Sequence, residues 1–493
     1  MPAPAVKSAA LEMTSQQRKE IFLAAMIGNV TVTELAQSNS VSRKFVYQQK
    51  SKADQALTEA FINAALDEQV IFTVPVTKAW IRQLVLSLTL TCHCSFRGVQ
   101  ELFSDLFDYD HLSLGTVHNI IAEAVERARK INAAAELTGI RVGAHDEIYQ
   151  AGKPVLVGAD ADSTFCYLLS AEQSCDETTW GVRLLELAER GLKLDYSVAD
   201  GGKALRAGQK AAWETVPCHG DVFHAERDFS KLVFYLERRS AGCTTARKKL
   251  ENKMERAKKR AKGHTISVKL SKARKAETQA VSLATDIRIL AEWINDDVLS
   301  LAGPESDTRR ELFDFITAEL KAREHLCPHR IAPLRKMLEN QRDNLLAFVD
   351  VLKTEFEQIS EKLNVPMYLT WRICELQGIS EEREAYWQKK ALLQKRLGNR
   401  YYDTEKAVTE AMKKIHRASS IVENINSRLR NYFFLRKQIG NDYLELLRFF
   451  LNHRKFIRSE RQERVDKSPA ELLYGRPHPH WLELLGFERF KQN

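Results

Sequence analysis

Three acidic residues lie in settings where a carboxylate needs a functional explanation. Asp146 stands in the middle of GAHDEIY, an otherwise apolar run that predicts a strand. Asp200 ends the run SVAD, and Glu423 lies in the helical pattern SSIVENINSRLRNY. Carboxylates from separate rigid elements suit hard divalent cations, and two such ions about 3.5–4 Å apart can cleave and rejoin a phosphodiester. The three acids therefore predict a site for two Mg²⁺ or Mn²⁺ ions.

Each aspartate also has a structural interpretation. Asp146 and Glu147 would be a solvated pair if their strand lay at the edge of a sheet. Asp200 precedes a Gly-Gly pair, where an aspartate commonly initiates a turn. Asp221, in HGDVFH, is an alternative candidate for the second metal ligand.

Glu423 is the third candidate ligand, and it has an alternative of its own. Ser420 lies three residues before it, and Ser-x-x-Glu is the pattern of a helix capping box. His224 is a possible neighbour of the acids or of a phosphate, although a packed histidine is an equally good interpretation. Asp160 and Asp162 follow a strand at a turn and are expected to be structural.

The elements that must position these acids begin near residue 140. Short runs rich in Val, Leu, Tyr and Phe, bounded by turn residues, predict strands at 141–149, 153–160, 164–170, 194–200 and 216–224. Helical patterns follow the third, fourth and fifth runs. Three antiparallel strands, a helix, a strand, a helix and a strand is the order of the ribonuclease-H-like fold. We therefore expect a mixed five-stranded sheet with helices, of the α+β or α/β class.

The remaining sequence is predicted to be helical, so the sheet would be interrupted by a long insertion. Pro328, Pro333 and Pro366 are expected at the joins between its helices. The expected organisation is a helix-turn-helix at 1–75, a second such region at 76–138, the core at 139–240, the insertion at 241–404, the rest of the core with the Glu423 helix at 405–465, and a tail at 466–493.

The N-terminal region has the pattern of a helix-turn-helix. A short helix, a turn and a third helix with polar and basic first turns would place side chains in the major groove of DNA. The candidates for base and backbone contacts are Arg43, Lys44, Tyr47 and Gln48. The second unit, around 95–130, has the same order, and plain packing of a helical hairpin remains an alternative for both.

A dense basic run spans 246–277, with thirteen Lys or Arg against three acids. Such a run is usually a solvated helix face. Because it interrupts a nuclease-like core, we expect it to follow phosphates through Lys258, Lys259 and Arg260. Arg428 and Arg430, just after Glu423, are further DNA-binding candidates.

Composition limits the class of protein. The chain has 493 residues and a formal net charge of +9, so a polyanionic partner is expected. No apolar run is long enough for a membrane span, and the N-terminal residues lack the apolar core of a secretory signal, which predicts an intracellular protein. Its eight cysteines show no disulfide framework. Zinc binding by 92–94, or by Cys218 with its neighbouring histidines, is less favoured than buried thiols.

The segments 139–229 and 417–475 resemble the DDE transposases of bacterial insertion sequences, within the integrase and transposase superfamily. The resemblance is carried by HDEIYQAGKPVLVGADADS, VADGGKAL, CHGDVFHAERD, SSIVENINSRLR and KSPAELLYG. The resemblance covers about a third of the chain. No single motif is specific, and it is the order of the motifs along the chain that makes the resemblance specific. The gap before Glu423 is far longer than in compact integrases.

The resemblance implies a metal-dependent transposase that cleaves element ends and joins them to target DNA. Its partners would be double-stranded terminal repeats and target DNA, bound by a homo-oligomer in the bacterial cytoplasm at the nucleoid, without a membrane. Two alternatives remain: an inactive, domesticated transposase acting as a DNA-binding regulator, and a ribonuclease-H-like nuclease without strand transfer.

Overall fold

The computed structural model describes residues 13–61, 73–258, 264–436, 439–487 and 489, without the side chains of residues 257, 258, 264 and 265. Contacts divide the chain into two units. One consists of Met1–Pro75 with Phe490–Asn493, and the other is Val76–Arg489. Each unit is described by itself.

The N-terminal unit is a set of three helices, α2 (Ser15–Ile27), α3 (Val32–Ser38) and α4 (Arg43–Ala60). Side chains of Thr14, Thr31 and Ser42 accept hydrogen bonds from the first turns, which satisfies otherwise unpaired N–H groups. The helices pack around a small apolar cluster formed by Ile21, Leu35, Ala36 and Val46. The predicted helices are thus present, while their use as a helix-turn-helix stays a prediction.

In the second unit, the described strands form one mixed five-stranded sheet in the order β3-β2-β1-β4-β5. The strands are β1 (Val142–Gln150), β2 (Lys153–Asp160), β3 (Cys166–Ala171), β4 (Tyr196–Ala199) and β5 (Cys218–Gly220). β1 to β3 are antiparallel, and β4 and β5 add in parallel. The prediction of a mixed five-stranded sheet is confirmed, and the order is compatible with a ribonuclease-H-like core.

The fifth predicted strand, 216–224, is wrong in length. β5 has three residues, and α10 begins at Val222. The backbone N–H of Phe223 donates to Asp221 Oδ1 at 2.8 Å, so the aspartate starts a helix where the sequence suggested a longer strand. His224 therefore lies in the first turn of that helix.

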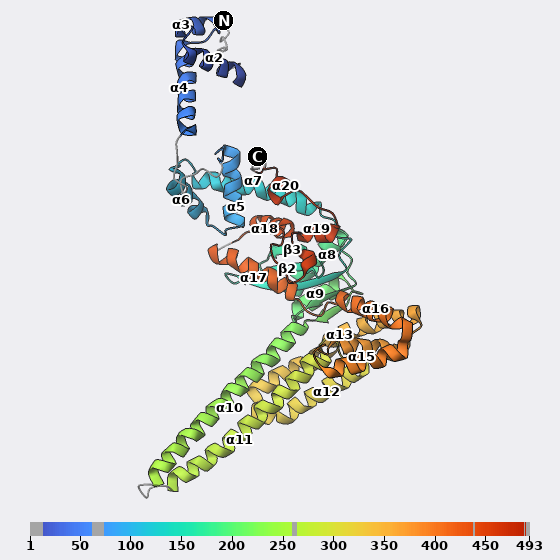
Figure 1. Ribbon diagram of the computed structural model, residues 1–493. Helices are drawn as coiled ribbons and strands as arrows, with labels where there is room; N and C mark the ends of the chain where they lie inside the picture. Colours follow the sequence, from blue (N-terminus) through green and yellow to red (C-terminus); the bar gives the residue numbers. More distant parts are fainter. Residues whose placement is uncertain (1–12, 62–72, 259–263, 437–438, 488, 490–493) are drawn as a thin grey trace. The chain divides into compact units, whose positions relative to one another are not determined.

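Helices cover both faces of the sheet (Figure 1). On one face α8 (Glu177–Glu189) and α9 (Lys203–Ala212) share a core with alternate sheet residues such as Leu156 and Tyr167. On the other, Ala144 and Ile148 of β1 pack with helices from both ends of the unit. Those helices are α5 (Lys78–Leu90), α6 (Phe96–Phe107), α7 (Leu114–Ala133), α17 (Ser420–Leu435), α18 (Asn441–His453) and α20 (Trp481–Leu484), with α19 (Pro469–Tyr474) against α18.

Strand periodicity determines where Asp146 faces. Because side chains alternate along a strand, Asp146 shares the face of Ala144 and Ile148, which α17 covers. His145 points the other way, toward the rings of Tyr167 and Trp180. The sheet therefore turns Asp146 toward the helix that carries Glu423.

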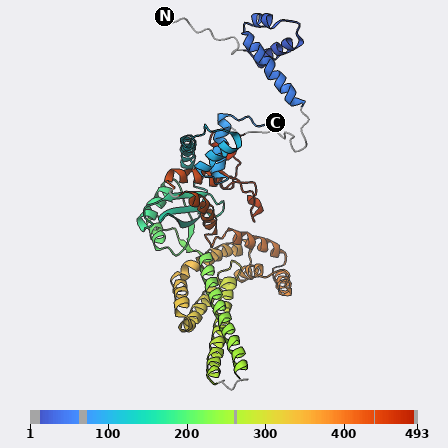
Figure 2. The same ribbon diagram turned by 90° about the vertical axis from the view of Figure 1, so that its left-hand side faces the viewer.

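Between β5 and α17 the described residues contain helices and no strand. These are α10 (Val222–Lys258), α11 (His264–Trp293), the π-helical turn η2 (Ile294–Val298), α12 (Ser306–Arg323), η3 (Glu324–Leu326), α13 (Pro328–Leu363), α14 (Met367–Gln377), α15 (Glu384–Leu397), η4 (Gly398–Arg400) and α16 (Tyr401–Lys414). They have an apolar core of their own, running from Val222 to Ile415. α10 and α11 pack side by side (Figures 1 and 2).

The proline prediction is correct at two of three positions. Pro328 is the first residue of α13, and Pro366 precedes α14. Pro333 instead lies inside α13, where it lacks the N–H for a helical hydrogen bond. Buried neighbours on this helix, including Ile331 and Leu334, give packing energy that offsets the loss.

None of the described helices is long and apolar enough to cross a membrane.

Candidate functional site

Two neighbouring strands bring the predicted aspartates to one end of the sheet. β1 and β4 run in parallel, and their last paired residues are His145 and Ala199. Asp146 is the next residue on β1, and Asp200 directly follows the end of β4. The interpretation of Asp146 as an edge-strand residue is wrong, because β1 is the central strand.

Asp146 is partly buried and lies close to other acids. Its carboxylate accepts hydrogen bonds from the Glu147 N–H (2.9 Å) and from Asn426 Nδ2 on α17 (2.8 Å). Burial raises its pKa to about 7, and repulsion from Asp200, Glu147 and Glu423 contributes to the rise. The acid that follows β4 and the acid on α17 thus each lie within electrostatic range of Asp146.

Asn426 lies three residues after Glu423 on α17 and contacts Asp146. Its Oδ1 is buried and has no hydrogen-bond partner among the described residues. When Asp146 is protonated, a flip of the Asn426 amide would let this oxygen accept a hydrogen bond from the Asp146 carboxyl group. Asn426 can therefore partner Asp146 in both protonation states.

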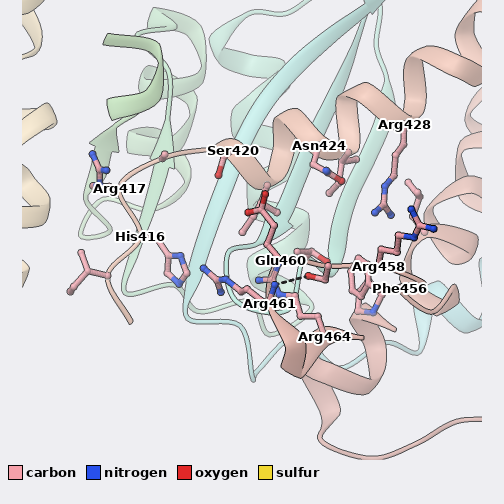
Figure 3. Close-up of a pocket in the computed structure, with 18 residues that line it drawn as sticks. His416, Arg417, Ser420, Asn424, Arg428, Phe456, Arg458, Glu460, Arg461 and Arg464 are labelled. Carbon is pink, nitrogen blue, oxygen red and sulfur yellow. Dashed lines mark hydrogen bonds between the residues drawn. The ribbon is translucent and has the colours of Figure 1, made fainter. Parts of the chain in front are cut away.

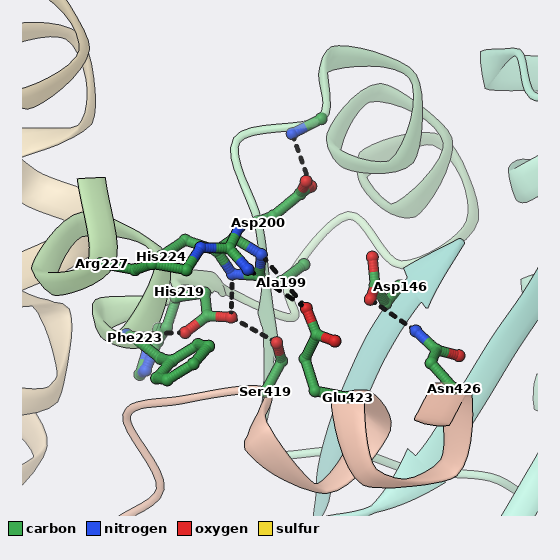
Figure 4. A network of polar contacts seen from close by, with 12 residues as sticks. Asp146, Ala199, Asp200, His219, Phe223, His224, Arg227, Ser419, Glu423 and Asn426 are labelled. Carbon is green, nitrogen blue, oxygen red and sulfur yellow. Dashed lines mark hydrogen bonds and ion pairs between the residues drawn. The ribbon is translucent and has the colours of Figure 1, made fainter. Parts of the chain in front are cut away.

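Glu423 lies in the first turn of α17 and faces basic side chains (Figure 4). Its Oε1 is 3.5 Å from His224 Nε2 and 3.7 Å from Arg227 Nη1, and its Oε2 is 3.9 Å from Arg430 Nη2. The capping-box interpretation required Ser420 to precede the helix. It is wrong, because Ser420 is the first residue of α17, and Ser419, which precedes it, makes no side-chain cap.

Asp221 occupies a different position from the one expected of a second metal ligand. It is buried, and its Oδ2 accepts a hydrogen bond from Ser419 Oγ and bonds His224 Nδ1 at 2.6 Å. Although burial acts to raise the pKa of Asp221, the bonds from His224 and Ser419 hold it below its ordinary value. The same bond raises the pKa of His224. Asp221, His224 and Glu423 therefore form a chain of polar contacts that orients Glu423.

Asp200 is held by the turn that follows it. Its Oδ1 accepts from the Gly202 N–H at 2.8 Å, and in Figure 4 this carboxylate points toward that N–H. Gly201 lies against the Gln341 side chain of α13, so a Cβ there would collide with it. The turn interpretation and a ligand role are compatible, since Oδ2 has no hydrogen-bond partner among the described residues.

The donor chemistry of this region fits Mg²⁺, but the ligand geometry is not assembled. Carboxylate oxygens are the ligands that Mg²⁺ prefers, and burial, together with repulsion from neighbouring acids, raises the pKa of Asp146. Yet no group of three His, Cys, Asp or Glu side chains among the described residues is arranged to hold a metal. Asp200 could offer its Oδ2 without breaking its turn, whereas Glu423 would have to leave Arg227 and Arg430.

All eight cysteines are described and all are free thiols. The interpretation as buried thiols is not met at the candidate positions, because Cys92 is exposed and Cys94 and Cys218 are partly exposed. The zinc alternatives at 92–94 and around Cys218 gain no support, since no metal-holding group occurs in the described part of the chain.

The N-terminal DNA-binding candidates occupy the first turns of α4. Arg43 is its first residue, and Arg43, Lys44, Tyr47 and Gln48 are all exposed. Tyr47 exposes 60% of its surface. These side chains are available to a partner, and a role in DNA binding stays a prediction.

The remaining DNA-binding candidates lie on other parts of the chain and have different neighbours. Lys259 and Arg260 lie outside the described residues, as does the side chain of Lys258. Arg430 faces Glu423, whereas Arg428 lies over the ring of Phe456, 5.6 Å from its centroid. The two arginines of α17 therefore do not belong to one surface.

Comparisons with known proteins do not assign the chain to a family. No family model matches the chain, and no curated protein matches its sequence. Among solved structures, the Drosophila P element transposase strand transfer complex is similar at 10% identity and a TM-score of 0.33, over 78% of this chain and 98% of that chain. A likeness this weak carries no argument about function.

Proposed function

We propose that this chain is a DDE-type DNA transposase that cleaves transposon ends and joins them to target DNA. The observation that carries the proposal is the environment of Asp146. The central strand, its parallel neighbour and α17 put three acids close enough for Asp200 and Glu423 to raise the pKa of Asp146. Acids that repel each other on rigid elements are what a divalent cation would stabilise.

In this proposal Asp146, Asp200 and Glu423 hold the metal. Two Mg²⁺ or Mn²⁺ ions would supply activation of the attacking oxygen and stabilisation of the leaving oxygen. Asp146 gives up its proton, Asn426 keeps its carboxylate oriented, and the contact from Asp221 through His224 positions Glu423. Release of Glu423 from Arg227 and Arg430 would accompany binding.

The remaining parts would bind DNA. The exposed first turns of α4 would read terminal repeats as a helix-turn-helix, and the basic pair α10 and α11 would contact phosphates. Joining two ends needs two active sites, so a homo-oligomer is proposed. The chain would belong to a bacterial insertion sequence and act at the nucleoid.

One alternative has an observation in its favour. Glu423 has basic partners and Asp200 is bonded to its own turn, so no ready metal site exists in the described residues. A domesticated transposase that binds DNA without cleaving it would look the same. A nuclease without strand transfer differs only in its products.

The test is nicking of supercoiled plasmid and joining of a labelled duplex to it, with Mg²⁺ or Mn²⁺. Asp146→Asn and Asp200→Asn should abolish both reactions while DNA affinity is retained. Asp162→Asn is the matched control, because Asp162 is an exposed acid that pairs with His416 instead, and it should remain active. Absence of metal-dependent nicking by the wild type would favour the regulator, and nicking without joining would favour the nuclease.

A further inference from the structure

A second concave site lies on the other side of α17. A cavity of about 530 Å³ opens between α17 and the segment 454–469, and a neighbouring one of about 230 Å³ shares Arg428, Phe456 and Arg458 with it. Figure 3 shows the larger one, with basic side chains entering from the helix and from the segment. The arginine groove is defined here by Arg428, Arg454, Arg458, Arg461 and Arg464.

The groove is separate from the carboxylates. Successive residues of an α-helix are about 100° apart, so residues two positions apart point about 160° from each other. Arg430 faces Glu423, and Arg428 faces Phe456 and the groove. The buried residues of α17, such as Val422 and Leu429, form the face between the two sites.

The groove carries an excess of positive charge, which Asp162 beside Arg461 and Arg464 offsets only in part. None of its five arginines forms an ion pair with a carboxylate of the described residues, and Glu460 is the acid that lines it. Burial lowers the pKa of Arg428, and repulsion from Arg454 adds to this. Burial also lowers the pKa of Arg464, and repulsion from Arg461 adds to this lowering. Partly buried cations that repel one another are stabilised by a bound anion.

The walls of the groove are held in place before any ligand binds. The segment folds back on itself, with the Phe456 N–H bonded to the Lys467 carbonyl and the Asp466 N–H bonded to the Phe456 carbonyl, both at 2.9 Å. Arg464 Nη2 donates to the Asp162 carbonyl at 2.6 Å. A guanidinium held in this way loses little entropy when it binds an oxyanion.

We infer that the arginine groove binds the phosphodiester backbone of a single DNA strand. Arginine forks match phosphate oxygens, and a row of them along connected cavities suits a chain of phosphates better than one isolated anion. A cavity of about 530 Å³ would be about 8 Å across if cubic, which is too narrow to enclose a duplex, because the major groove alone of a duplex is about 12 Å wide. The identity of the polyanion as DNA rests on the proposed function.

The test uses the exposed pair Arg458 and Arg461 in the full-length chain. Each phosphate contact to a single strand contributes about 0.7 to the slope of log affinity against log salt. Arg458→Ala/Arg461→Ala should therefore lower that slope by about 1.4 and weaken binding of a labelled 20-nucleotide strand by about 25-fold at 0.1 M salt. Lys395→Ala/Arg396→Ala removes the same charge from exposed positions on α15 and should change both quantities by much less.

A second measurement places the contact directly. A photoreactive side chain at Ser459 should crosslink to the strand, and salt should suppress the crosslink. The inference would be overturned if both double variants lost affinity for the strand equally, or if no crosslink formed. It would also be overturned if only duplex binding were weakened, or if millimolar inorganic phosphate displaced the strand. Because binding is measured without metal, its failure is distinguishable from failure of the proposed function, which is read from nicking.

Discussion

Replacement of Asp146 by asparagine should stabilise the metal-free protein. Asp146→Asn keeps the shape of the side chain and removes a charge that burial and three neighbouring acids disfavour. The hydrogen bonds can be kept, because a flipped Asn426 would offer its unpaired Oδ1 to the new amide. A site residue that costs stability is expected where function needs a charge in an unfavourable place.

The magnitude follows from the pKa. Folding raises the pKa of Asp146 from 3.8 to about 7, and each unit corresponds to about 1.36 kcal/mol. Below pH 3.8 Asp146 is protonated in both the folded and the unfolded state, so it costs the folded protein no stability. As pH rises, the unfolded chain releases its proton first, so the folded state loses stability up to about pH 7. The full penalty above that pH is about 4 kcal/mol.

The assay is calorimetric unfolding in EDTA at several pH values. With about 2.1 cal/mol/K of unfolding entropy per residue, a unit of about 400 residues shifts its Tm by roughly 1 °C per kcal/mol. Asp146→Asn should therefore melt about 4 °C above the wild type at pH 8 and much closer to it at pH 4. Mg²⁺ should narrow the gap by stabilising the wild type. A variant that is less stable, or a gap independent of pH, would refute the reasoning.

Two further predictions concern buried basic side chains. Arg309 is fully buried and donates to the carbonyls of Val298, Leu301 and Pro304. Arg309→Leu leaves these carbonyls without their donor, at about 1–3 kcal/mol for each one that stays unpaired, so it should destabilise the protein by about 3 kcal/mol or more; a loss below 1 kcal/mol in chemical unfolding would contradict this. Burial lowers the pKa of His145 to about 4, so about 3 kcal/mol should be lost as pH falls from 6.5 to 4, and His145→Gln should lose less over that range.

The sheet was predictable because its strands are short apolar runs separated by strong turn residues. The fifth strand was overestimated because VPCHGDVFH has apolar residues toward both of its ends, and Asp221 in its middle starts α10 early by accepting a hydrogen bond from the Phe223 N–H. Pro333 was assigned to a join by its local rule, whereas the packing of α13 overrides that rule.

The candidate site was predictable in part. A charged residue inside an apolar strand points to Asp146, and the Gly-Gly turn points to Asp200. The partners of Glu423 were not predictable, because Arg227 lies on a helix that starts nearly 200 residues earlier. The arginine groove had no sequence signal, since KFIRSERQER mixes both charges and only the fold turns its arginines toward Arg428.

The central claim is that Asp146, Asp200 and Glu423 act together as metal ligands. Its most direct test is a titration of the chain with Mn²⁺, followed by electron paramagnetic resonance, for the wild type and for Glu423→Gln. The account predicts two bound ions for the wild type and weaker binding, with at least one ion lost, for the variant. Unchanged Mn²⁺ binding by Glu423→Gln, or no binding by the wild type, would contradict it.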